Sequence, residues 1–144
     1  MASTIVVGYD GSESSQRAVD FAVKAASAQG KTIVIAHVLE WSPYSFLTPT
    51  ELEERHKRRN EELQRADTAL LTPLVATLKD SGVEVKTILK YGHIAETLIK
   101  IAQAEEASHL VIGRTGHSEL ETRLFGSVAG SLAQAAPAPV TIVP

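Results

Sequence analysis

The stretch Thr4-Ile5-Val6-Val7-Gly8-Tyr9-Asp10-Gly11-Ser12 begins as a run of β-branched residues and ends in a turn. β-branched residues favour strands, an Asp-Gly pair favours a turn, and a serine after the turn is a good helix N-cap. Small and apolar residues then recur at helical spacing over residues 13–29, and Gly30 supplies a helix stop. The sequence therefore predicts a strand that passes directly into a helix.

The rest of the chain repeats this alternation. Residues 32–39 are almost continuously apolar, as expected of a central parallel strand, whereas residues 83–89 alternate as an edge strand does. The helical stretch over residues 51–78 contains Pro73, which is expected to kink or divide it. Further helices are predicted from Gly92 through Ala102 and over residues 128–135, and further strands over residues 109–112 and Val140–Val143. The pattern predicts one α/β domain over residues 1–144, with a five-stranded parallel sheet, right-handed crossovers and helices on both faces.

Composition limits the classes of function. The chain has 144 residues, a formal net charge of -3 and no cysteine. No strong positive field is available to gather nucleic acid or an anionic membrane, and the missing cysteine excludes disulfides, thiolate catalysis and cysteine-ligated metals. The start Met1-Ala2-Ser3-Thr4 has no targeting pattern, and no apolar run approaches the length of a membrane span. We expect a cytoplasmic protein with no nucleic-acid partner and no membrane insertion.

A glycine-rich segment follows the fourth predicted strand. Residues 111–127 read VIGRTGHSELETRLFGS, in which two residues separate Gly113 from Gly116 and nine more precede Gly126-Ser127. Glycines let backbone N–H groups approach an anion closely, and a helix that begins at Gly126-Ser127 adds the positive end of a dipole. The lysine of a Walker loop and the glycine fingerprint of dinucleotide-binding proteins are both missing. A phosphate site is predicted, and its candidate ligands are backbone amides with Thr115, Ser127, Arg114 and Arg123.

Residues near the strand ends have both a structural and a functional interpretation. The Asp10 carboxylate suits ribose hydroxyls and equally suits an Asx turn before Gly11, which is itself a turn residue or a phosphate contact. Ser12 is first a helix N-cap and second a ligand. His37 fits a hydrogen-bonded core position, and His117 is placed for nucleotide contact or proton transfer. Neither metal-ligand spacing nor a nucleophile elbow appears in the sequence, so a binding site is favoured over a strong catalyst.

Four segments together resemble the universal stress protein family, and the resemblance covers nearly all of the chain. They are Ile5-Val6-Val7-Gly8-Tyr9-Asp10-Gly11-Ser12-Glu13, His37-Val38, residues 113–127 and Ala136-Pro137-Ala138-Pro139-Val140-Thr141-Ile142-Val143. The resemblance implies a Rossmann-like α/β domain of the adenine nucleotide alpha hydrolase type, with strand order 3-2-1-4-5. It also implies binding of ATP or AMP, because the Gly-2x-Gly-9x-Gly-Ser motif is intact in this chain.

The family's functional positions transfer to matching residues. The resemblance implies that Asp10 holds the ribose, a nearby phosphate and Mg²⁺, with Gly11 and Ser12 beside it, and that the backbone of Val38 recognises adenine. The implied phosphate-binding residues and their neighbours are Gly113, Arg114, Thr115, Gly116, His117, Gly126, Ser127 and Val128. The sequence departs from the family pattern at Gly92-His93-Ile94-Ala95, where Gly-Asp-Pro and a small residue are common.

The resemblance also implies a homodimer, because the family pairs through its last strand, here Val140–Val143. We expect a stress-response protein that acts as an adenine-nucleotide-dependent switch toward a protein partner, with at most slow ATP hydrolysis. Two alternatives stay open at this point. One is an ATP-dependent transferase of the same superfamily, and the other is a dimeric interaction module that works without nucleotide.

Overall fold

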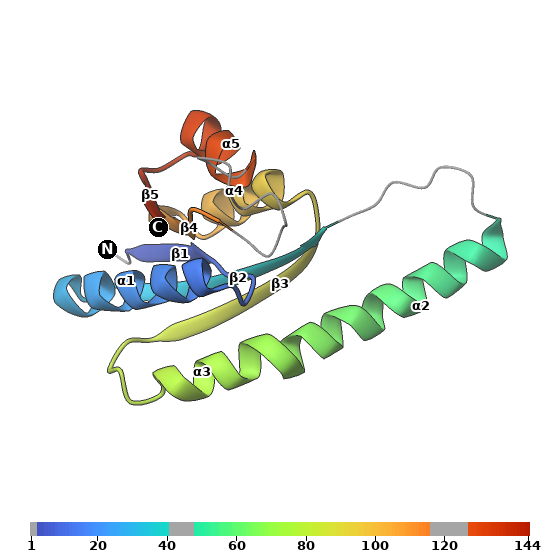
Figure 1. Ribbon diagram of the computed structural model, residues 1–144, viewed down its shortest axis with the longest axis horizontal. Helices are drawn as coiled ribbons and strands as arrows, with labels where there is room; N and C mark the ends of the chain where they lie inside the picture. Colours follow the sequence, from blue (N-terminus) through green and yellow to red (C-terminus); the bar gives the residue numbers. More distant parts are fainter. Residues whose placement is uncertain (1–2, 41–47, 116–126) are drawn as a thin grey trace.

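A computed structural model describes residues 3–40, 48–115 and 127–144 of the chain. Its strands are β1 (Thr4–Gly8), β2 (Thr32–Glu40), β3 (Val85–Gly92), β4 (Ala107–Gly113) and β5 (Val140–Val143). They form a parallel sheet in the order β3-β2-β1-β4-β5, which confirms the predicted topology (Figure 1). The side chains of Ile5, Val6 and Val7 in the central strand are fully buried, as a continuous β-branched run predicts.

Helices cover both faces of the sheet. On one face lie α1 (Glu13–Gln29) and α3 (Thr72–Leu78), and on the other lie α4 (Ile94–Ala104) and α5 (Ser127–Ala135) (Figure 1). Successive residues of β1 enter different cores, so that Val7 packs with α1 and α3 while Val6 packs with α4 and α5. From β1 to β3 the connecting helices lie on the first face and each new strand is added toward one edge of the sheet. After β3 the helices α4 and α5 lie on the second face, and β4 and β5 are added on the other side of β1. The winding therefore reverses between the neighbouring strands β1 and β4.

The predicted ends of α1 are confirmed. Ser12 is the N-cap, because its hydroxyl accepts a hydrogen bond from the backbone N–H of Ser15 at 3.2 Å. Gly30 ends the helix in the left-handed conformation, with φ of 65°, and donates its N–H to the Ala26 carbonyl. The inner face of α1 carries small buried residues, among them Ala18 and Ala22, which bring the helix close to the sheet.

The helical stretch before β3 continues through Pro73 instead of stopping there. α2 (Pro49–Ala66) runs into a π-helical turn (Asp67–Leu71) and then into α3. At this turn the Thr72 N–H donates to the Asp67 carbonyl five residues back, directly before the proline that has no N–H to donate. The sequence thus predicted an irregular helix near Pro73, and the structure shows a π-helical turn there, in which the helix is locally wider.

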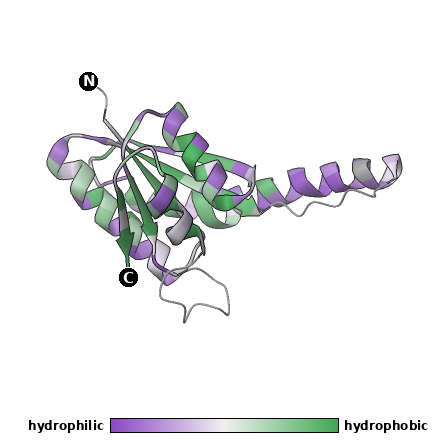
Figure 2. Ribbon diagram, turned by 90° about the horizontal axis from the view of Figure 1, so that it is seen from above, coloured by the Kyte–Doolittle hydropathy of each residue, from purple (hydrophilic) through white to green (hydrophobic). Residues whose placement is uncertain are grey.

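The outer part of α2 leads away from the sheet and is strongly hydrophilic (Figure 2). Most of its described side chains are exposed, which fits the alternating acids and bases of this segment. It contacts β3 through Tyr91, whose hydroxyl donates to Glu62 Oε2 at 3.1 Å and whose ring lies 4.5 Å from the Arg59 guanidinium carbon. Across the described ranges, every helix is too short or too polar to cross a membrane.

One predicted boundary is wrong. Gly92 was expected to begin a helix, but it ends β3, where it is paired with Glu40. His93 is the N-cap position, and α4 starts at Ile94. Glycine alone does not distinguish the end of a strand from the start of a helix. Here, a Cβ on Gly92 would lie 2.6 Å from the Thr97 hydroxyl, so close packing also favours glycine.

Candidate functional site

The carboxyl ends of β1 and β4 bring two of the singled-out segments together. Val7 near the end of β1 is paired with Val111 in β4, and the two strands are followed by residues 9–12 and by residues 114 and 115. In doubly wound sheets, ligands bind beyond the carboxyl ends of strands where the winding reverses. The structure thus places the residues that follow β1 and those that follow β4 at the same end of the sheet.

The turn after β1 is an Asx turn at Asp10, followed by a glycine in the left-handed conformation. The Asp10 carboxylate accepts hydrogen bonds at Oδ1 from both the N–H and the hydroxyl of Ser12, which makes an Asx turn. Gly11 lies in the left-handed region with φ of 82°, so a glycine is required there. The structural roles of Asp10, Gly11 and Ser12 are thus established, and their ligand roles stay predictions.

Gly113 ends β4 directly against the first turn of α1. A Cβ built on Gly113 would lie 2.6 Å from the Ser14 Oγ and 2.7 Å from the Ser14 carbonyl carbon. No real Cβ makes contacts this short with backbone, so the residue must be glycine for packing alone. The first glycine of the motif therefore has a structural function independent of any phosphate.

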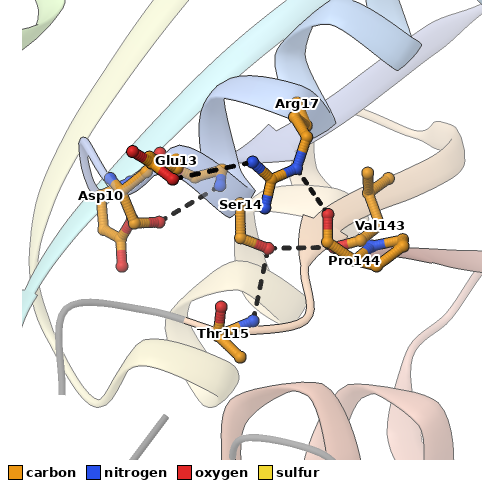
Figure 3. Close-up of polar contacts among 9 residues, drawn as sticks. Asp10, Glu13, Ser14, Arg17, Thr115, Val143 and Pro144 are labelled. Atoms are coloured by element: carbon orange, nitrogen blue, oxygen red, sulfur yellow. Dashed lines mark hydrogen bonds and ion pairs between the residues drawn. The ribbon is translucent and has the colours of Figure 1, made fainter. Parts of the chain in front are cut away.

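Ser14 is the residue that the sequence reasoning missed. Its side chain is 2 % exposed, and its hydroxyl accepts from the Thr115 N–H at 3.4 Å and donates to the Val143 carbonyl at 3.0 Å (Figure 3). Its sequence neighbours gave no signal, because Thr115 and Val143 are 101 and 129 residues away. Arg114 has an exposed side chain, and its backbone N–H donates to the same Val143 carbonyl at 2.7 Å.

Val38 lies past the end of β1, in the strand beside it. Pairing between β1 and β2 ends at Gly8 and Ala36, where the Tyr9 N–H donates to the Ala36 carbonyl at 2.9 Å. In a parallel ladder the N–H and C=O of one residue point to the same side and alternate along the strand. The backbone groups of Val38 therefore point the same way as those of Ala36, toward the region beyond the end of β1.

His37 takes the core position predicted for it. Its ring is buried, and Nδ1 lies 2.6 Å from the Tyr9 carbonyl oxygen. A carbonyl only accepts, so Nδ1 carries the proton and donates it. Burial, followed by the charge of Asp10, raises the pKa of the Tyr9 phenol above its ordinary value. Tyr9 is therefore a neutral packing residue at neutral pH.

The other predicted site residues divide into two groups. Gly116, His117 and Gly126 lie outside the described residues. Ser127 is the first residue of α5, and the side chain of Val128 packs against the core between the sheet and α4.

In the described part of the chain, three or more His, Asp or Glu side chains never come close enough to form a metal site. The metal role of Asp10 stays a prediction, and Mg²⁺ commonly takes only one or two carboxylates when phosphates supply the rest.

Fold and site together define the class. The chain has a doubly wound parallel α/β sheet whose winding reverses between β1 and β4, and in such sheets ligands bind at the switch point. The family model described as the universal stress protein family matches residues 1–144, and the chain belongs to this family.

Individual relatives agree with this assignment. A universal stress protein of Thermus aquaticus is 31% identical over 144 residues, covering 99% of each chain. The solved structure of universal stress protein UspA from Lactobacillus plantarum superposes with a TM-score of 0.84 at 24% identity, covering 99% of this chain and 97% of that one. A universal stress protein solved in complex with cAMP has a TM-score of 0.70 at 29% identity, with coverage of 99% and 96%.

Proposed function

We propose that this protein binds an adenine nucleotide, ATP or AMP, at the carboxyl ends of β1, β2 and β4. The observation that carries the proposal is the meeting of the Asp10 turn and the Gly113–Thr115 segment at the switch point between β1 and β4. The family relative in complex with cAMP supports an adenine nucleotide as the ligand.

The described residues suggest how the nucleotide would lie. Adenine pairs with the backbone N–H and C=O of Val38, which point past the end of β1. The ribose and Mg²⁺ face the Asp10 carboxylate. The phosphates take backbone N–H groups of the glycine motif and the N-terminus of α5, where the helix dipole favours negative charge.

We further propose a binding switch in stress response, formed by a homodimer that presents a nucleotide-dependent surface to a partner protein. β5 suits pairing because it has β4 on one side and, among the described residues, lacks a strand on the other. Slow ATP hydrolysis is compatible with this site, since a bound Mg²⁺ would polarise the phosphates. The Asp10 carboxylate already accepts from the N–H and the hydroxyl of Ser12, which favours a binding role over that of a general base.

The test is an ATP and AMP titration of the wild type and two variants by calorimetry. Asp10→Asn keeps an oxygen that can accept from Ser12, so the turn survives while the charge is lost. Asp20→Asn removes the same charge from the exposed outer face of α1 and is the matched control.

We expect Asp10→Asn to weaken nucleotide binding about tenfold or more, since a hydrogen bond to a charged group is lost. Asp20→Asn should bind as the wild type does. Saturable binding that is equal in all three proteins would remove Asp10 from the site. Absence of binding in the wild type would refute the proposed function and leave the nucleotide-independent dimer as its replacement.

A further inference from the structure

Ser14 lies where three segments far apart in the sequence meet. It belongs to the first turn of α1, and it contacts the residues after β4 and the last residue of β5 (Figure 3). Its side chain is buried, so water does not compete for the hydroxyl. A buried hydroxyl with two backbone partners fixes the relative positions of both.

The direction of the hydrogen bonds at Ser14 follows from the partners. The Val143 carbonyl can only accept, so the single hydroxyl proton of Ser14 points to it, at 3.0 Å. The Thr115 N–H can only donate, so it points to the Ser14 oxygen, at 3.4 Å. The two hydrogen bonds therefore run in one direction, from the Thr115 N–H to the Ser14 hydroxyl and from that hydroxyl to the Val143 carbonyl.

Two more contacts tie the end of β5 to the same region. The Val143 carbonyl also accepts from the Arg114 N–H at 2.7 Å, so both residues after Gly113 are linked to it. The Arg17 Nε donates to the Pro144 carbonyl at 2.7 Å (Figure 3). Gly113 itself lies so close to Ser14 that a Cβ on it would clash with the Ser14 backbone, so β4 and the first turn of α1 pack directly against each other.

We propose that Ser14 is a positioning residue that couples nucleotide occupancy of the segment after β4 to the edge strand β5. The inference rests on the proposed function, because Thr115 belongs to the segment expected to face phosphate. At 3.4 Å the bond from Thr115 to Ser14 is long and weak, and a phosphate oxygen is a stronger acceptor. When phosphate takes the Thr115 N–H, the Ser14 hydroxyl loses the donor that polarises it, and its bond to Val143 weakens.

The test uses NMR of the full chain, with the Val143 carbonyl carbon shift and amide exchange at Arg114 and Thr115 as readouts. Ser14→Ala removes both bonds. The matched control is Ser15→Ala, which removes a neighbouring buried hydroxyl that donates to the Ser12 carbonyl and accepts from the Asp10 N–H. A general loss of helix stability would affect both variants alike.

Without nucleotide, Ser14→Ala should speed exchange of the Thr115 amide about fivefold, the size expected for one lost hydrogen bond, and should shift the Val143 carbonyl resonance. Ser15→Ala should change neither. If Ser14→Ala left both the Thr115 amide exchange and the Val143 carbonyl resonance unchanged, Ser14 would not connect Thr115 to Val143, and this conclusion would not depend on nucleotide binding.

With AMP or ATP added, the Val143 carbonyl resonance of the wild type should move. In Ser14→Ala the nucleotide should bind at least as tightly, because Thr115 no longer has a competing acceptor, while the Val143 response disappears. An equal Val143 response in both proteins would overturn the coupling. Absence of nucleotide binding in the wild type would refute the proposed function instead. The comparison of the variants without ligand would still show whether Ser14 connects Thr115 to Val143.

Discussion

Gly113 illustrates how one residue can satisfy two requirements. A glycine in a phosphate-binding motif is normally explained by access of the ligand to the backbone. Here the contact with Ser14 requires glycine even in the free protein. A loss of nucleotide binding in a Gly113 variant would therefore not identify a phosphate contact, because the packing of β4 on α1 would change as well.

Substitution of Gly113 tests this packing directly. We expect Gly113→Ala to lower the free energy of unfolding by about 1–3 kcal/mol without ligand, the range of overpacking in a tight core. The control is Gly130→Ala in α5, where a Cβ meets no atom within 4 Å. That change should raise stability by about 0.5–1 kcal/mol, because alanine is the better helix former. Urea unfolding of both variants decides the point, and equal effects would contradict the steric explanation.

Ser14, in contrast, could not be found from the sequence. The roles of Ser12 and Gly11 were predictable because both act on residues within three positions along the chain. The partners of Ser14 come from two other strands and depend on how closely α1 packs on the sheet. Local sequence patterns determine turns and caps, and contacts across the sheet require the assembled fold.

At the scale of elements, His109 joins β4 to β5. Its Nε2 lies 2.5 Å from the Thr141 hydroxyl. Burial first, and then the positive charge of Lys31, lowers the pKa of His109 below its ordinary value. The folded state therefore favours the neutral ring.

This pKa shift predicts a pH dependence of stability. An unfolded chain binds the His109 proton more readily than the folded one, so the stabilisation is complete above the ordinary histidine pKa of about 6.5. It should be lost as the pH falls below that value. Urea unfolding between about pH 5.5 and 7.5 should show a steeper loss in the wild type than in His109→Gln, and identical pH profiles would refute the assignment.

Contact between α2 and β3 depends on Tyr91. Its ring and hydroxyl contact Arg59 and Glu62 near the middle of the long helix. We expect Tyr91→Ala to speed amide exchange in α2 about fivefold, because about 1 kcal/mol of contact is removed. Lys90→Ala, at the exposed neighbouring position, should leave α2 exchange unchanged. Equal exchange in both variants would mean that other contacts hold α2.

The elements also differ in how well the sequence predicted them. The five strands were predictable from β-branched runs that alternate with helical periodicity, and their order from the resemblance to the family. The π turn at Asp67–Leu71 was not, since Pro73 is compatible with a kink, a break or a widened turn. Which of these forms depends on the packing of Leu71 and Leu74 on the sheet, where both are buried.

At the scale of the whole molecule, β5 offers backbone groups for assembly. The Pro139 carbonyl accepts from Leu110 in β4 and the Val143 carbonyl from Arg114 just after it, so the alternate residues Val140 and Ile142 point their backbone groups to the other side. Exposed edges of this kind are templates for pairing with a further strand. Among the described residues, this edge is the part of the sheet best suited to a twofold contact.

A proline at this edge tests the dimer. Ile142→Pro removes an outward N–H and leaves the bonds to β4 in place, while Ile142→Ala shortens the side chain and keeps the N–H. We expect light scattering to find a dimer for Ile142→Ala and mainly monomer for Ile142→Pro. A wild-type monomer, or a dimer unaffected by proline, would exclude pairing through β5.

The central claim is that an adenine nucleotide occupies the switch point between β1 and β4. Native mass spectrometry of freshly purified wild-type protein, before and after addition of ATP or AMP, tests it most directly. We predict a species heavier than the chain by the mass of one adenine nucleotide per protomer, which is lost on denaturation. A spectrum of bare protein in both samples, together with no heat of binding for either nucleotide, would contradict the account.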